Sequence, residues 1–193
     1  MKKSLVAIVI ALASAFALAS PSPARAATTQ TWWITVAGVG PAKLGMTLAQ
    51  AQKTGKFTWS PCGTDVASAG GQGVWVMFSG SAVTPESNTL TAAYVTKATS
   101  GGILFATPGG IRVGSTVAAL KRSTSGLFLS TGRVFTGYAP GGFNYVYYQR
   151  ANATHWAMYV LPHTISSPSQ IRPWTPLTTI AISSYQLGAM NGC

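Results

Sequence analysis

The chain has 193 residues, of which 47% are hydrophobic. It contains 13 lysines and arginines but only two acidic residues, which gives a net charge of +11. The two acids, Asp65 and Glu86, are the only pair available for the two-carboxylate chemistry of glycoside hydrolysis. The basic residues are spread singly instead of forming a run, which argues against a specific nucleic-acid partner.

Residues 1–26 have the pattern of a secretory signal peptide. Lys2 and Lys3 form its charged start, residues 5–19 its apolar run, and residues 24–26 a small-x-small cleavage pattern. Removing this segment leaves ten basic residues against two acidic ones, a net charge of about +8. The apolar run is shorter than the roughly 20 residues of a comfortable membrane span. The sequence therefore predicts a secreted, extracellular protein with no membrane span.

The first expected strand and helix lie shortly after the signal-like segment. Residues 31–37 are β-branched and aromatic and run into a Gly/Pro-rich turn, which is typical of a short strand followed by a break. Thr47 and Gln50 then have the spacing of a capping box, and Gly55 lies where a helix end favours a left-handed residue. This pattern predicts a helix of about two turns, which depends on packing for its stability.

A duplication links this region to a later one. Residues 37–49 align without a gap on residues 106–118, with five identical and three chemically similar positions. The identical positions that we assign to the repeat are Gly40 and Gly109, Gly45 and Gly114, and Thr47 and Thr116. The second copy predicts a second short helix with Thr116 as its cap. The duplication predicts two tandem repeats, residues 27–105 and residues 106–193.

After each helix the hydrophobic period changes from 3.6 to 2, which indicates strands. The candidates are residues 73–79 and 90–98 in the first half, and 142–149, 155–161 and 177–183 in the second, with 128–138 as a further one. Each half is therefore predicted to be a short helix followed by an antiparallel β meander, an α+β architecture. Four prolines between residues 162 and 176 exclude regular structure from a loop that contains His163, Arg172 and Trp174.

Cys62 and Cys193 are the only cysteines, and export would place them where disulfides persist. One intramolecular pairing is open to them, and it would tie the first repeat to the C-terminus. A free reactive thiol or an intermolecular bridge is the alternative.

Catalytic and metal-binding patterns are sparse. His155 and His163 are the only histidines, no serine lies in a G-x-S-x-G elbow, and the glycines before the first helix lack the lysine of a phosphate-binding loop. The two histidines are eight residues apart with a predicted strand between them, a poor spacing for zinc. The sequence predicts no metal and no cofactor.

The aromatic residues are the remaining functional lead. By strand alternation, Trp75 is expected to point outward while its neighbours face the core. In the strand at 155–161, we expect Trp156, Met158 and Val160 to face the helices and His155 and Tyr159 to face outward. Over residues 142–150, the more polar alternate set is expected to be exposed, namely Asn144, Val146, Tyr148 and Arg150.

The chain also resembles known families. The motif Gly45-Met46-Thr47, followed by a short helix and a meander and then a second copy, resembles the β-lactamase inhibitory protein family and the related lipoprotein fold of the outer-membrane assembly family. Residues 107–116 and 177–180 and the closing Gly192-Cys193 look like a group of secreted actinobacterial proteins of unassigned function. The inhibitory family implies a sheet whose aromatic face grips a partner protein. Two departures are Ser115 in place of methionine, and one cysteine in each half instead of a disulfide within each.

Together these features predict an exported, non-enzymatic binding protein, an inhibitor being one form of it. An aromatic and basic sheet face would bind an acidic protein or an anionic cell-envelope polymer. The predicted binding residues are Trp75, Tyr148, Arg150, His155, Tyr159, Arg172 and Trp174. The alternative is an envelope-directed hydrolase that uses His155 or His163 with Asp65 or Glu86. A purely structural envelope component is a third reading.

Overall fold

The structure is a computed structural model that describes residues 30–61, 66–71, 73–79, 89–132, 144–150 and 152–184. The predicted signal peptide, both cysteines and both acidic residues, Asp65 and Glu86, lie outside these ranges. The described chain is mostly β-sheet with few helices, which is compatible with the predicted α+β class and equally with a mainly β one.

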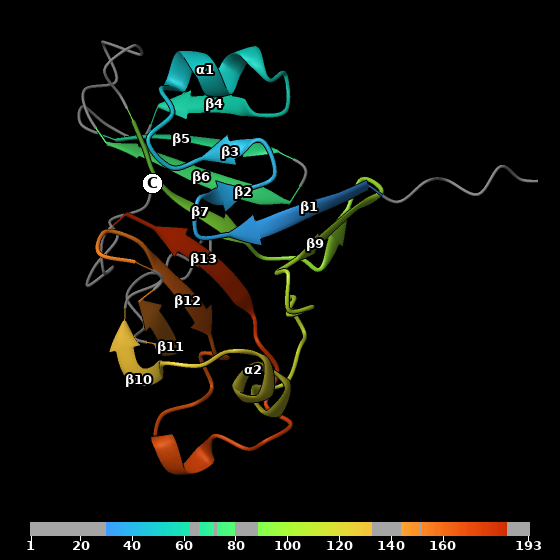
Figure 1. Cartoon of the computed structure of the whole chain (residues 1–193), viewed down its shortest axis with the longest axis vertical. Coiled ribbons are helices and arrows are strands. Elements are labelled where there is room, and N and C mark those ends of the chain that lie inside the picture. The colour runs from blue at the N-terminus through green and yellow to red at the C-terminus, as the bar shows by residue number, and fades with distance from the viewer. Residues whose placement is uncertain are drawn as a thin grey trace, which may run out of the picture.

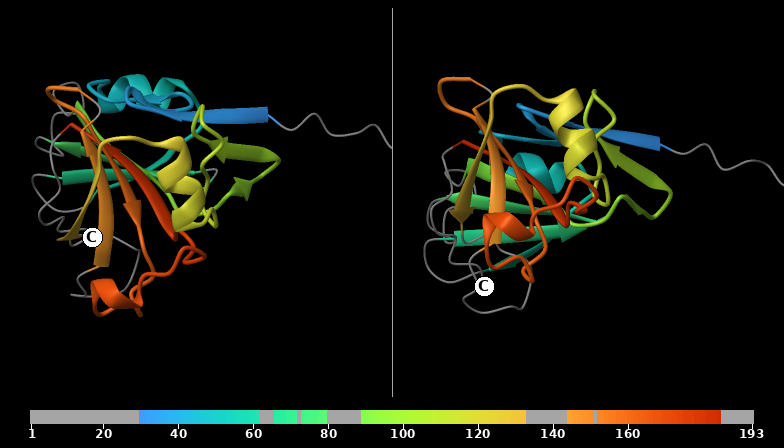
Figure 2. Two further views of the ribbon diagram at one scale, coloured as in Figure 1. Left: turned by 60° about the horizontal axis from the view of Figure 1, so that its bottom comes forward. Right: turned by 90° about the horizontal axis from the view of Figure 1, so that it is seen from below.

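The described residues form two sheets (Figure 1). The larger has eight strands, all paired antiparallel, in the order β10 (Leu127–Gly132), β11 (Asn144–Arg150), β12 (Trp156–Val160), β13 (Thr179–Ser183), β7 (Thr89–Val95), β6 (Val74–Ser79), β5 (Val66–Gly71) and β4 (Thr58–Pro61). The smaller has the order β3 (Ala42–Lys43), β2 (Gly38–Val39), β1 (Gln30–Thr35), β9 (Ile103–Ala106) and β8 (Thr99–Ser100). Its β1 and β9 are parallel. Figure 2 shows β10–β12 crossing β4–β6 at a steep angle, as expected when twist accumulates over many strands.

Two short α-helices precede the two meanders. They are α1 (Leu48–Lys53) and α2 (Val117–Ser123), and a single 3₁₀ turn, η1 (Pro168–Gln170), lies in the later proline-rich loop. The predicted caps are confirmed: Thr47 and Gln50 form a capping box, and the Thr116 hydroxyl accepts from the Ala119 amide at 3.2 Å. Gly55 has the predicted left-handed backbone, with φ at 63°.

One face of the large sheet packs against both helices and the small sheet. Leu48 of α1, Leu120 of α2 and Trp32 of β1 belong to the same buried cluster as Val76 of β6 and Ile180 of β13. Burial of these apolar side chains supplies the main driving force for holding such short helices in place. The large sheet thus has a covered face, on the helix side, and a second face on the other side, whose central residues, such as Tyr94 and Met158, are buried as well.

All the strands predicted after the helices are present, with shifted ends. The strands β4, β5, β8 and β9 were not predicted. The Gly/Pro-rich segment that was predicted to be a turn after β1 instead contains two strands of two residues each, β2 and β3, which pair as a hairpin. The predicted absence of regular structure in the proline-rich loop holds apart from η1.

Candidate functional site

A row of side chains crosses the second face of the large sheet from β6 to β10. Each member of the row is the cross-strand partner of the next, and the spatial order is Trp75, Tyr94, Ala181, Met158, Tyr148 and Phe128. Residues directly opposite each other in antiparallel strands point to the same face. Trp75 is 48% exposed at one end and Phe128 is 41% exposed at the other, while the four between them are buried. The row therefore has two exposed aromatic ends.

The β10 end of the row is an aromatic and cationic cluster. The Phe128 ring stacks on Tyr148 with centroids 5.4 Å apart and meets Trp156 edge-on at 5.9 Å. Arg150, directly opposite Trp156 in the β11–β12 pair, has its guanidinium carbon 5.9 Å from the Trp156 ring centroid. These contacts hold a planar cation and exposed aromatic surface together. We call Trp75, Phe128, Tyr148, Arg150 and Trp156 the aromatic face.

Three of the predicted binding residues, Trp75, Tyr148 and Arg150, lie on this face. The inward orientation of Val74, Val76 and Phe78 is confirmed, which leaves Trp75 outward. The alternate set in β11 does point away from the helices, but its exposure was overestimated: Asn144, Val146 and Tyr148 are buried, and only Arg150 is exposed.

The prediction for β12 is wrong. Tyr159 is 4% exposed and packs in the helix-side cluster, whereas Met158 and Val160 belong to the cluster on the second face. The reason is the register: Tyr159 is opposite Ile180 of β13 and Tyr147 of β11, both on the covered face. Tyr159 is therefore a core residue and not an exposed binding anchor.

His155 lies in the turn between β11 and β12. Its Nδ1 atom is 2.8 Å from the side-chain amide nitrogen of Asn152. Its backbone N–H donates to the Asn152 side-chain oxygen at 2.7 Å. These bonds give His155 a structural role in the turn. His163 is exposed in the proline-rich loop. Asp65 and Glu86 lie outside the described residues, so the alternative hydrolase, which pairs one of them with a histidine, stays a prediction.

Arg172 and Trp174 lie in the proline-rich loop beside α2, away from the aromatic face. The Ala118 amide at the start of α2 donates to the Pro173 carbonyl at 2.8 Å, which fastens this loop to the helix. Trp174 is 72% exposed. The predicted binding residues therefore do not form a single surface: three lie on the aromatic face, and the others lie in the β11–β12 turn, in the core and in the proline-rich loop.

The aromatic face also contains residues that sequence reasoning missed. Phe128 lies in the further candidate strand at residues 128–138, and the sequence predicts Trp156 to face the helices. The signal that would have found them is the hairpin connecting β11 and β12, because its register sets Trp156 opposite Arg150. A cation opposite a tryptophan on one sheet face is a favourable cross-strand pair.

Charge on the described surface has a single sign. All nine lysines and arginines in the described ranges are exposed, and those ranges contain no aspartate or glutamate. Within them, no group of three or more His, Cys, Asp or Glu side chains is placed to hold a metal ion. None of the described helices has the length and apolar character that a bilayer crossing requires.

Comparison with protein-family models, with curated proteins and with solved structures gave no match. The function of the chain is therefore inferred from its own residues.

Burial raises the pKa of Tyr148 and of Tyr159 above the ordinary 10.0, and in Tyr159 a hydrogen bond with Thr124 partly offsets this rise. The folded state then holds the phenolic protons more tightly than the unfolded chain. The resulting stabilisation is complete below about pH 10 and is lost as the pH rises through the raised pKa values. We expect the free energy of unfolding to fall as the pH rises above about 10, and to fall less steeply in a Tyr148→Phe, Tyr159→Phe variant. Urea unfolding across this range measures the slopes, and parallel slopes for the two proteins would contradict the expectation.

Proposed function

We propose that this chain is an exported, non-enzymatic binding protein that holds an acidic protein partner on its aromatic face. The observation that supports this best is the cross-strand row with Trp75 and Phe128 exposed at its two ends. Tryptophan and arginine are enriched among the residues that dominate binding energy in protein interfaces. Export is inferred from the signal-like residues 1–26.

The mechanism is surface complementarity. Trp75 and Phe128 would supply apolar area that is lost to water on binding, and Arg150 would pair with a carboxylate of the partner. The nine exposed cations of the described surface favour the approach of an acidic partner and raise its association rate. The positive charge would also attract an anionic envelope polymer. Binding of such a polymer would depend on charge more than on the aromatic rings.

The proposed architecture is two tandem repeats, and local geometry supports it. Gly45 and Gly114 have φ values of 82° and 86°. Their amides donate to the carbonyls of Leu90 and Leu177, each at 2.8 Å. Leu90 is the second residue of β7 and Leu177 lies just before β13, so each pre-helix turn is tied to the last strand of its own meander.

The strand order of the large sheet supports the same proposal. β4 to β7 and β10 to β13 run inward from opposite edges and meet at the antiparallel pair of β7 and β13. The aligned Gly40 and Gly109 differ, because Gly40 has a left-handed φ of 52° whereas in the second copy Gly110 takes this role at 79°. A relationship to the β-lactamase inhibitory protein family and to secreted actinobacterial proteins stays a proposal on these grounds.

The test is capture of the partner from the secreting culture, with identification by mass spectrometry and affinity measurement on the purified pair. We expect Trp75→Ala with Phe128→Ala to weaken binding by roughly 30-fold or more, in line with the loss of interface anchors. Both side chains are substantially exposed, so the melting temperature is expected to change little.

Trp33→Ala is the matched control, because Trp33 is 51% exposed but lies on β1 of the small sheet. Unchanged capture by the double variant, or an equal loss in Trp33→Ala, would contradict the proposed face. Binding that is abolished by moderate salt yet insensitive to both aromatic substitutions would identify the anionic polymer as the occupant.

A further inference from the structure

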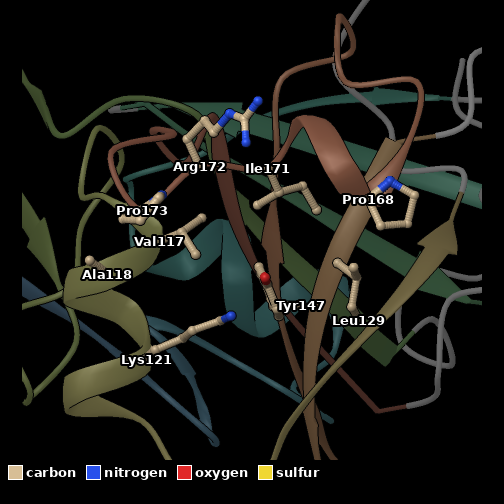
Figure 3. A pocket seen from close by; sticks show the side chains of 9 residues that line it. All are labelled: Val117, Ala118, Lys121, Leu129, Tyr147, Pro168, Ile171, Arg172 and Pro173. Carbon is tan, nitrogen blue, oxygen red and sulfur yellow. The ribbon is translucent and has the colours of Figure 1, made fainter.

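A pocket of about 380 Å³ lies on the helix side of the large sheet, between α2, strands β10 and β11, and the loop that contains η1 (Figure 3). Its lining residues are Val117, Ala118, Lys121, Leu129, Tyr147, Pro168, Ile171, Arg172 and Pro173. Ligand pockets in proteins commonly measure about 300–1,000 Å³, so this one has the size for a small molecule with one ring.

The pocket combines an apolar wall with two cations from different elements. Lys121 extends from α2 toward Tyr147, with its Nζ atom 5.3 Å from the ring centroid, whereas Arg172 lies on the loop at the opposite side of the pocket (Figure 3). Val117, Leu129 and Ile171 supply apolar surface between them. In the part of the chain that the structure describes, no carboxylate neutralises either cation. The pocket therefore has the chemistry to hold an anion attached to an apolar body.

The walls are held in place by backbone hydrogen bonds. The amides of Val117 and Ala118 donate to the carbonyls of Thr175 and Pro173, at 2.9 and 2.8 Å. The Arg172 amide donates to the Thr175 hydroxyl at 2.9 Å. These bonds fix the loop against α2, and they also occupy the first amides of the helix. Recognition of an anion therefore falls to the side chains of Lys121 and Arg172.

We propose that this pocket binds a small organic anion, a carboxylate or phosphate attached to a flat apolar body. The anionic group would pair with Lys121 beside the Tyr147 ring, and Arg172 on the opposite side would add to the positive field of the pocket. The apolar body would contact Tyr147 and the apolar wall, which favours an aromatic ring over a sugar or a free inorganic ion.

This site is independent of the proposed function. Tyr147 belongs to the helix-side cluster, whereas the aromatic face is on the other side of the same sheet. Loss of ligand binding at the pocket is consequently distinguishable from loss of partner capture at Trp75 and Phe128.

The experiment is an amide-detected NMR titration of the purified protein with phenylacetate and with phenyl phosphate. At least one of them is expected to bind with a dissociation constant below about 1 mM and to shift the amides of Val117, Lys121 and Ile171. Phenylacetamide keeps the ring without the charge, and acetate and inorganic phosphate keep the charge without the ring. Each of these is expected to bind at least about tenfold more weakly. Preference for phenyl phosphate over phenylacetate, or the reverse, identifies the anionic group.

Variants assign the binding to the pocket. Lys121→Met is expected to weaken binding of the probe by about tenfold, because it removes a charge-assisted contact. Arg172→Gln is expected to weaken it by less, because it removes a charge on the pocket rim that does not contact the anion. Arg122→Gln and Arg112→Gln are the matched controls, since both positions are exposed and lie outside the pocket lining. Their effect is expected to stay within about twofold, as screened surface charges contribute little.

Three results would overturn the proposal. They are no pocket shifts for either probe up to about 10 mM, equal binding of phenylacetamide, and equal losses in the control and pocket variants. All four substituted side chains are exposed, so the amide spectrum of each variant verifies its fold before titration.

Discussion

Tyr159→Ala is expected to lower the free energy of unfolding by about 3–5 kcal/mol, the usual cost of removing a buried aromatic ring. Tyr159 is 4% exposed in the helix-side cluster, with Ile180 and Tyr147 as its cross-strand neighbours. Truncation would leave a cavity beneath the helices, in a layer that the large sheet, both helices and the small sheet all share. Urea unfolding monitored by fluorescence measures the change.

Two further variants separate the contribution of the buried Tyr159 ring from that of its hydroxyl and from that of an exposed ring. Tyr159→Phe keeps the ring and loses the hydroxyl with its hydrogen bond to Thr124, so a loss of about 1 kcal/mol is expected. Trp75→Ala removes an exposed ring from the other side of the sheet and is expected to cost no more than about 0.5 kcal/mol. Equal stabilities of Tyr159→Ala and Trp75→Ala would place Tyr159 on the surface, contrary to the structure.

The contrast between β6 and β12 explains how far the sequence alone could predict the aromatic face. In β6, the alternate residues Val74, Val76 and Phe78 are all strongly apolar, so their orientation toward the core follows from period-two alternation. In β12, the sequence WAMYV is apolar at every position, because both faces of the sheet are buried there. Alternation then divides the β12 residues into two sets, but it does not show which set faces the helices. Only the pairing with β11 and β13 decides this, and pairing is a non-local property.

The same limit applies to the strands that were missed. β5 has the sequence VASAGG, whose alanines and glycines have low strand propensity, and its place between β4 and β6 comes from ladder hydrogen bonds. The pocket beside α2 depends likewise on long-range bonds, from the amides of Val117 and Ala118 to a loop some 55 residues later. The local signals were reliable: the caps at Thr47 and Thr116 are made by side chains within three residues of the amides they bind.

Gly38→Ala is expected to be among the most damaging single substitutions in the chain, with a loss of about 3 kcal/mol or more in the free energy of unfolding. Gly38 has a φ of 139°, and a Cβ atom there would overlap the Ala42 carbonyl oxygen and lie 2.9 Å from the Lys43 Cα. Both contacts are with the backbone of β3, which cannot move aside as a flexible side chain can. The hairpin would have to open, and it would release Val39, a fully buried member of the core.

Gly45→Ala and Gly114→Ala provide the comparison, because they change the same atom in a similar backbone conformation but in open space. Their φ values are 82° and 86°, and an added Cβ meets nothing within 4 Å at either position. Backbone strain alone is then expected to cost about 1–2 kcal/mol at each. Thermal and urea unfolding of the three variants measure the difference. A loss at Gly38 no larger than at Gly45 would contradict the close β2–β3 contact, and unequal losses at Gly45 and Gly114 would count against two equivalent repeats.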